Sequence, residues 1–203
     1  MKKIVFAFTV FLSALFSIQV FAGSVNDTSN LYKKLHLSGK MNYHVFSQAY
    51  NHFKQSESSN GVFTIIDYSQ PSSKKRFWII DSRKKKVLLS SYVSHGKNSG
   101  QLYARHFSNV VDSHQTSLGV FRTGETYMGK HGYSLRLDGL SKGKNDNARK
   151  RAIVIHGADY ANPGVIKKAG QLGRSWGCPA LPTYLAKKAI DMIKNGTFIY
   201  AYS

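Results

Sequence analysis

Cys178 is the only cysteine in the chain, and the residues around it suit nucleophilic chemistry. It lies in the stretch GRSWGCPALP, directly after Gly177, whose N–H can approach a bound group without obstruction by a side chain. A thiolate nucleophile needs a base to take its proton and donors for the oxyanion that forms on attack. The backbone N–H groups of Trp176, Gly177 and Cys178 are candidates for those donors. A buried, unreactive thiol is the alternative that the residue types leave open.

His156 is the best candidate for the base among the eight histidines. It ends the apolar run RAIVIH and precedes Gly157, so we expect it at the mouth of a strand. The segment between His156 and Cys178 is rich in turn residues, which would allow the chain to fold back and bring the imidazole to the thiol. A purely structural histidine at the end of a strand remains the alternative.

The sequence predicts a mainly β fold to position these two groups. Short β-rich runs are separated by turn residues at 62–68, 77–80, 87–89, 118–123, 133–137, 152–156 and 197–202. A short helix is expected at 163–169. A longer helix is expected at 183–194, where Pro182 precedes the first turn and Gly196 follows the last.

The segment before residue 61 differs in character from the rest. Residues 23–42 are polar and turn-rich, and we expect a loosely held arm there. Residues 43–54 carry their apolar side chains at helical spacing, which predicts an amphipathic helix that packs on a neighbouring domain rather than on a membrane. We therefore divide the chain into an N-terminal arm and helix at 23–60 and a main domain at 61–203.

The first 22 residues are typical of a secretory signal. Lys2 and Lys3 precede a nearly continuous apolar run from Ile4 to Phe21, and Ala22 fits a cleavage site before Gly23. An uncleaved anchor is the alternative; no later segment is apolar enough to cross a membrane. An exported protein with one cysteine has no internal disulfide, so the expected location is the periplasm or the cell-wall compartment.

The chain is strongly basic, with a net charge of +19, or +17 once the signal and its two lysines are removed. Such a charge attracts anionic partners. Because the basic runs at 83–86 and 142–151 fall in short turns, without aromatic residues interleaved along one element, we expect cell-wall polymer rather than nucleic acid. No metal or cofactor is expected, since the histidines lack close ligand spacing and one cysteine cannot build a zinc site.

Two segments, RAIVIHGADY and LGRSWGCPALP, resemble the core of the murein L,D-transpeptidase catalytic-domain family. The stretches VFTIIDYSQPSSKKRFWIID, VSHGKNSG, FSN and SLGVFRTGETYMGKHGYSLRLDGLSKG resemble the same family in the expected order. The resemblance covers residues 61–203, which makes that segment the catalytic domain, and it implies an L,D-transpeptidase-like β-sandwich or barrel. Ordered matches of this length are more specific than a Cys–His pair.

The resemblance implies a role for each matching residue near the cysteine. Cys178 would be the acylated nucleophile and His156 its base, with the Gly157 carbonyl holding the imidazole tautomer. Ser175 and Gly177 fall on the family's Ser-x-Gly-Cys element. The commoner form of the family has histidine where this chain has Trp176, and arginine where it has Ala180; both departures fit a branch with a Ser-Trp-Gly-Cys-Pro motif.

The second departure leaves open which residue neutralises a substrate carboxylate, because a guanidinium is the group expected to do so. The candidates are Arg174, Arg149 and Arg151, and Arg174 is favoured, since it lies nearest to Cys178 in the sequence. The other residues expected near the substrate are Ser175, Arg149, Arg151, His95 and Tyr160.

The resemblance implies peptidoglycan stem peptides as substrates. Cys178 would attack the carbonyl after the L-centre of the diamino acid, expel D-alanine and pass the acyl group to an amine of another stem. Water as acceptor would give an L,D-carboxypeptidase, and a different acyl bond would give an endopeptidase. Two other hypotheses remain: a cysteine peptidase of ordinary proteins, and a non-catalytic cationic wall-binding protein. The oligomeric state is not indicated.

Overall fold

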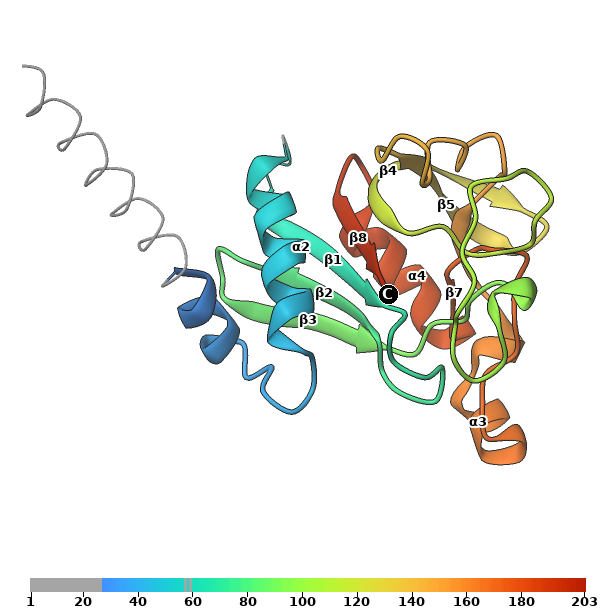
Figure 1. Cartoon of the computed structure of the whole chain (residues 1–203), viewed down its shortest axis with the longest axis horizontal. Helices are drawn as coiled ribbons and strands as arrows, with labels where there is room; N and C mark the ends of the chain where they lie inside the picture. The colour runs from blue at the N-terminus through green and yellow to red at the C-terminus, as the bar shows by residue number, and fades with distance from the viewer. Residues whose placement is uncertain (1–26, 57, 59) are drawn as a thin grey trace, which may run out of the picture.

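The computed structural model describes residues 27–203, except residues 57 and 59. The expected signal at 1–22 and the first residues of the arm lie outside this part. Eight strands form one sheet in the order β3-β2-β1-β8-β4-β5-β6-β7 (Figure 1). They are β1 (Val62–Asp67), β2 (Phe77–Asp81), β3 (Lys86–Ser91), β4 (Gly119–Gly129), β5 (Gly132–Gly139), β6 (Val154–Gly157), β7 (Ala180–Leu181) and β8 (Phe198–Tyr202). The predicted mainly β fold with a few helices is confirmed.

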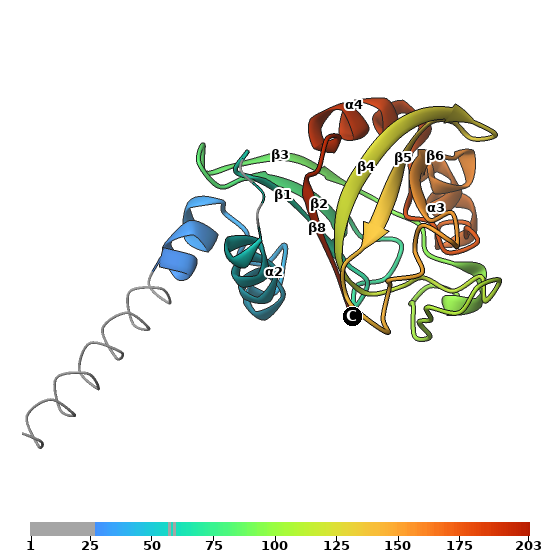
Figure 2. The same cartoon turned by 90° about the horizontal axis from the view of Figure 1, so that it is seen from above.

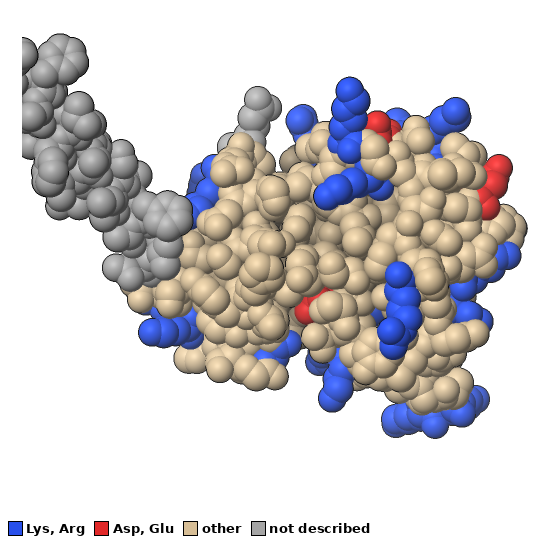
Figure 3. Space-filling view, viewed as in Figure 1, with Lys and Arg blue, Asp and Glu red and all other residues tan. Residues whose placement is uncertain are grey.

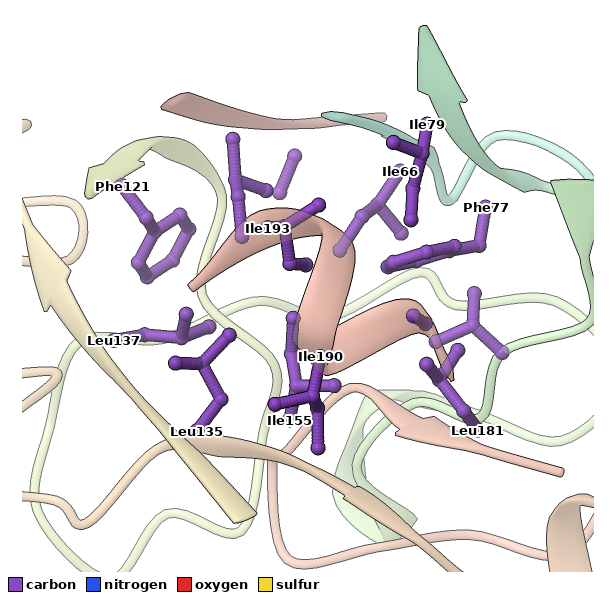
Figure 4. Packing of buried hydrophobic residues seen from close by; sticks show 14 of the residues in the cluster. Ile66, Phe77, Ile79, Phe121, Leu135, Leu137, Ile155, Leu181, Ile190 and Ile193 are labelled. Atoms are coloured by element: carbon purple, nitrogen blue, oxygen red, sulfur yellow. The ribbon is translucent and has the colours of Figure 1, made fainter. Parts of the chain in front are cut away.

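Helix α4 (Thr183–Ile193) lies on the inner side of the curved sheet. It contacts β5 and β6 and also β1, although β8 and β4 separate these strands in the sheet order, so the sheet must curl around the helix (Figure 2). Ala186, Ala189, Ile190 and Ile193 form its buried face. In Figure 4, Ile190 and Ile193 lie among side chains from several strands, including Phe121, Leu135, Leu137 and Ile155.

Helix α2 (Tyr43–Gln55) covers the outer face of β1 and β8 (Figure 1). Phe46 and Phe53 pack there with Phe63 and Phe198, and the Phe53 and Phe63 rings stack at 4.7 Å. Side chains alternate along β1, so Phe63 faces α2 while Ile66 belongs to the α4 core. Because both faces are covered, β1 is apolar almost throughout.

The predicted amphipathic helix is confirmed, and it packs on the sheet of the adjoining main domain. The prediction of a loosely held arm is wrong for the described residues. Residues 27–34 are helical, and Leu31, Leu35, Leu37 and Met41 are buried in the same cluster as α2. The boundary at residue 60 stays a prediction, although this packing ties both sides of it together.

Two features of the far edge of the sheet position the site. Strand β7 was not expected, and it pairs in parallel with β6, placing His156 opposite Ala180. Strands β4 and β5 form a longer hairpin than predicted, whose turn reaches Lys130 and His131. Helix α3 (Pro163–Ala169) lies where it was expected. Within residues 27–203, apart from 57 and 59, no helix combines the length and the apolarity that a membrane span requires.

We predict that Phe46→Ala lowers the free energy of unfolding by about 3–5 kcal/mol, because Phe46 is fully buried between α2 and β1. Urea denaturation measures this loss. The control, Met128→Ala, removes a side chain that is 76% exposed and should change stability by less than about 0.5 kcal/mol. Equal effects of the two substitutions would show that α2 is not part of the same folding unit.

Candidate active site

The turn from Ser175 to Cys178 is held by the Ser175 side chain. Its hydroxyl donates to the Cys178 carbonyl at 2.6 Å and accepts from the Gly177 N–H at 3.1 Å. Gly177 has a φ of +115°, and a Cβ at this position would lie 2.7 Å from the Gln115 carbonyl oxygen. Only glycine fits this turn without strain. Ser175, expected near the substrate, instead shapes the turn that presents the thiol.

The hydrogen bonds of the Ser175 hydroxyl reduce the number of backbone N–H groups that could stabilise an oxyanion. The Gly177 N–H is buried and already donates to Ser175, so it is not available to a substrate in this arrangement. The N–H groups of Trp176 and Cys178 remain as candidates. Gly177 therefore serves the site through its backbone conformation.

Cys178 is half-buried against the α4 core, and its Sγ lies 3.7 Å from the Ala152 carbonyl oxygen. Burial raises the pKa of the Cys178 thiol, while the Val154 backbone and the Arg151 guanidinium act in the opposite direction. The net effect favours the thiol at neutral pH. Use of this thiol as a nucleophile would therefore need a base.

His156 lies at the end of β6 and is 1% exposed. Its Nδ1 is 2.9 Å from the Gly157 carbonyl oxygen, so Nδ1–H donates and Nε2 keeps its lone pair for a proton. Opposed residues of a parallel pair share a face, so the imidazole lies on the face of Ala180, two residues after Cys178. The imidazole and the thiol thus belong to the same edge of the sheet.

The environment keeps His156 neutral at pH 7. Burial lowers the pKa of His156, the bond to Gly157 opposes this, and nearby His131 lowers it further. The His131 ring stacks on the His156 ring at 4.3 Å with 21° between the planes. The contact between His131 and His156 could not be predicted from the sequence, because it depends on the length of the β4–β5 hairpin.

The three candidate arginines are in different environments. Arg149 binds the carboxylates of Glu125 and Asp138, which commits its guanidinium to its own chain. Arg151 bonds to the loop of residues 108–117 and faces inward. Arg174 makes only long contacts, 3.3 Å to the Gly100 carbonyl being the shortest among the described residues. Of the three, Arg174 keeps the most donor capacity for a substrate.

His95 does not contact solvent as a cleft residue would, since it is 1% exposed. Its Nδ1 accepts from Arg76 Nη2 at 2.8 Å, and Nε2–H donates to the Gly100 carbonyl. Burial and the Arg76 charge lower the pKa of His95 to about 4, so it stays neutral. Its carbonyl accepts the Ser175 N–H at 2.9 Å. His95 thus supports the turn that carries Cys178, and its buried ring does not line an open cleft as expected.

Tyr160 and Trp176 differ in their exposure to solvent. Tyr160 packs against Ala158, Ala161 and Ala180, and burial followed by the nearby Cys178 raises the pKa of its phenol. Trp176 is 69% exposed, with the His114 ring stacked 4.5 Å away and Lys97 Nζ 5.2 Å from its centroid. Tyr160 therefore borders the thiol from inside, and Trp176 marks the outer rim of the site.

The family model of the L,D-transpeptidase catalytic domain matches residues 37–202. The chain belongs to this family. The match begins before residue 61, so α2 lies within it. No significant match is found among curated protein sequences. Within the described residues, no three His, Cys, Asp or Glu side chains are grouped as a metal site would require.

Solved structures of L,D-transpeptidases, and one of a cell shape determining protein, are also similar to this chain. One from Mycobacterium smegmatis is 16% identical with a TM-score of 0.43, covering 70% of this chain and 59% of its own. Mycobacterium tuberculosis L,D-transpeptidase 1 is 14% identical with a TM-score of 0.40, and the match covers 70% of this chain and 62% of that protein's chain. A mutant of the helical cell shape determining protein Pgp2 from Campylobacter jejuni is 13% identical with a TM-score of 0.48. The match covers 71% of this chain and 47% of the Pgp2 chain. The chain thus spans about three fifths of the length of the first of these structures.

We predict that His131→Ala raises the pKa of His156 toward its ordinary value, because the substitution removes a neighbouring imidazole and lets water reach the ring. NMR titration of the ring protons measures this directly. His52→Ala, which alters an exposed histidine on α2, is the control and should leave the pKa of His156 unchanged. An unmoved pKa in the His131 variant would contradict the proposed effect of stacking.

Proposed function

We propose that this chain is an exported L,D-transpeptidase of the Ser-Trp-Gly-Cys-Pro branch that acts on peptidoglycan stem peptides through a Cys178 acyl-enzyme. The observation that carries the proposal is the bond from His156 Nδ1–H to the Gly157 carbonyl. It directs the basic Nε2 lone pair away from the backbone, at the edge of the sheet that also carries Cys178. Family membership supports the reaction class, and the expected signal at 1–22 supports export.

In the first half-reaction, His156 Nε2 takes the proton of the Cys178 thiol. The sulfur attacks the carbonyl carbon that follows the L-centre of the stem's diamino acid, and the carbonyl oxygen becomes an oxyanion facing the Trp176 and Cys178 N–H groups. The C–N bond to D-alanine then breaks, and the leaving amine takes the proton from His156. A thioester on Cys178 and free D-alanine result.

The second half-reaction regenerates the thiol. An amine of another stem gives a proton to His156 Nε2 and attacks the thioester carbonyl. The C–S bond breaks, the new amide forms, and the proton returns to sulfur. Because His156 is neutral at pH 7, it is ready to accept a proton at the start of each half-reaction.

Substrate binding is proposed to use Arg174. Its guanidinium is close to the backbone of Lys97 and Gly100, beside the turn that carries Cys178, and is not neutralised by a carboxylate of the described residues. A planar guanidinium matches the terminal carboxylate of D-alanine. The molecular surface supports a polyanionic partner more generally, because Lys and Arg outnumber Asp and Glu over the face in Figure 3.

We predict that Cys178→Ser and His156→Ala abolish processing of purified tetrapeptide muropeptides, while His52→Ala processes them like the unaltered chain. Mass spectrometry of the products distinguishes the acceptors. Cross-linked dimers indicate transfer to an amine, and tripeptides without dimers indicate hydrolysis. Continued processing by a correctly folded Cys178→Ser chain would rule out the cysteine mechanism.

We predict that Arg174→Ala raises KM about tenfold or more with a smaller change in kcat, because the lost contact binds the substrate before and during the reaction. Arg122→Ala, which removes an exposed arginine on β4, is the control. A substrate with an amidated C-terminus refines the test. The unaltered chain should process this substrate less efficiently than the free acid, and the difference should be much smaller in the Arg174 variant. An equal penalty in both would place the carboxylate elsewhere.

A further inference from the structure

Arg151 is an inward-facing arginine whose bonds all go to neutral groups. It lies immediately before Ala152, in the turn that leads into β6. Its two terminal nitrogens donate to the loop that precedes β4; the acceptors are the Ser108 and Gln115 carbonyls and the Ser113 and Ser117 hydroxyls. These bonds fix the guanidinium in place but do not neutralise its charge.

The charge of Arg151 has no acidic partner within the described residues. None of the ion pairs there includes it, and its Nε is buried without a hydrogen-bond partner. Arg149, two residues earlier, binds two carboxylates at the surface instead. A half-buried cation without a counter-ion is unfavourable, so its retention at this place suggests that an anion forms nearby.

The nearest group that can become an anion is the Cys178 thiol. Arg151 Nη2 lies 3.3 Å from the point where a Cβ of Gly177 would be, directly before Cys178. The Sγ atom lies 3.7 Å from the carbonyl oxygen of Ala152, directly after Arg151. The first contact places the guanidinium beside the residue that precedes Cys178, the second places the sulfur beside the residue that follows Arg151, and the charges of the two groups interact.

Neither the phenols that interact with the sulfur nor the proposed base supplies a positive charge at pH 7. The phenols of Tyr68 and Tyr160 feel Cys178, and burial raises the pKa of both, so they stay neutral. Burial lowers the pKa of His156, which is also neutral. Burial lowers the pKa of Arg151 too, but Cys178 opposes this, and an arginine remains charged.

We propose that Arg151 is a positioning residue that serves as the counter-ion of the Cys178 thiolate when His156 takes the thiol proton. The inference rests on the proposed role of Cys178 as nucleophile. It assigns the two functions of a thiolate–imidazolium pair to different residues: Arg151 supplies the fixed positive charge, and His156 moves protons. His156 then stays neutral in the resting state.

The test is the pH dependence of Cys178 alkylation by iodoacetamide, a small neutral probe, in the full chain. Arg151→Gln should raise the pKa of the thiol by about one unit or more, because the positive charge is lost. Arg151→Lys keeps the charge but loses the planar set of bonds to the loop, and its thiol pKa should stay within about half a unit of the unaltered value. Arg149→Gln is the matched control and should have no effect.

Two outcomes would overturn the proposal. Equal changes in the Gln and Lys variants would show that Arg151 acts only by holding the loop. If Arg151→Gln does not fold, the same measurement on His156→Ala decides. The thiol pKa should change little when Arg151 is the counter-ion, and should rise by about one unit or more when an imidazolium is. Because alkylation needs no peptide substrate, these results do not depend on whether muropeptides are processed.

Discussion

The parallel pairing of β6 with β7 is the constraint on which the site depends. Strand β7 has only two residues, yet it sets His156 opposite Ala180 and so fixes where the chain carries Cys178. A slip of one residue would turn the Ala180 side chain to the opposite face. The segment after β3 prevents this, because the Ser94 N–H donates to the Ala180 carbonyl at 2.8 Å. The core that the curved sheet forms around α4 supplies the apolar support against which Cys178 packs.

Buried polar groups bonded to backbone, rather than surface ion pairs, keep this edge of the sheet in place. Arg76 is fully buried, donates to the Val93 carbonyl and holds the ring of His95, whose carbonyl in turn accepts from Ser175. Each link satisfies a group that would otherwise be costly to bury. The arrangement leaves Cys178 on a turn with little freedom, which is what a nucleophile aimed at one carbonyl requires.

The fold was largely predictable, because alternating or continuous apolar runs identify β1, β2 and β8, and Pro182 and Gly196 bracket α4. Strand β7 is too short to leave a pattern in the sequence. The arm was misjudged because turn residues around Leu31 and Leu37 outweigh a few apolar positions. The Cys–His pair could be named from the motifs. The different environments of Arg149 and Arg151 could not be predicted from the sequence. These two arginines face opposite ways only because of the folded conformation of the turn that carries them.

We propose that Cys178 is the acylated residue and that His156 assists it. Incubation with a carbapenem, whose strained lactam is an acyl donor, followed by intact-mass analysis and peptide mapping, tests it most directly. We expect one adduct per chain, on the peptide that contains Cys178, formed much more slowly in His156→Ala. An adduct on another residue, or none in a preparation that processes muropeptides, would contradict this account of the enzyme.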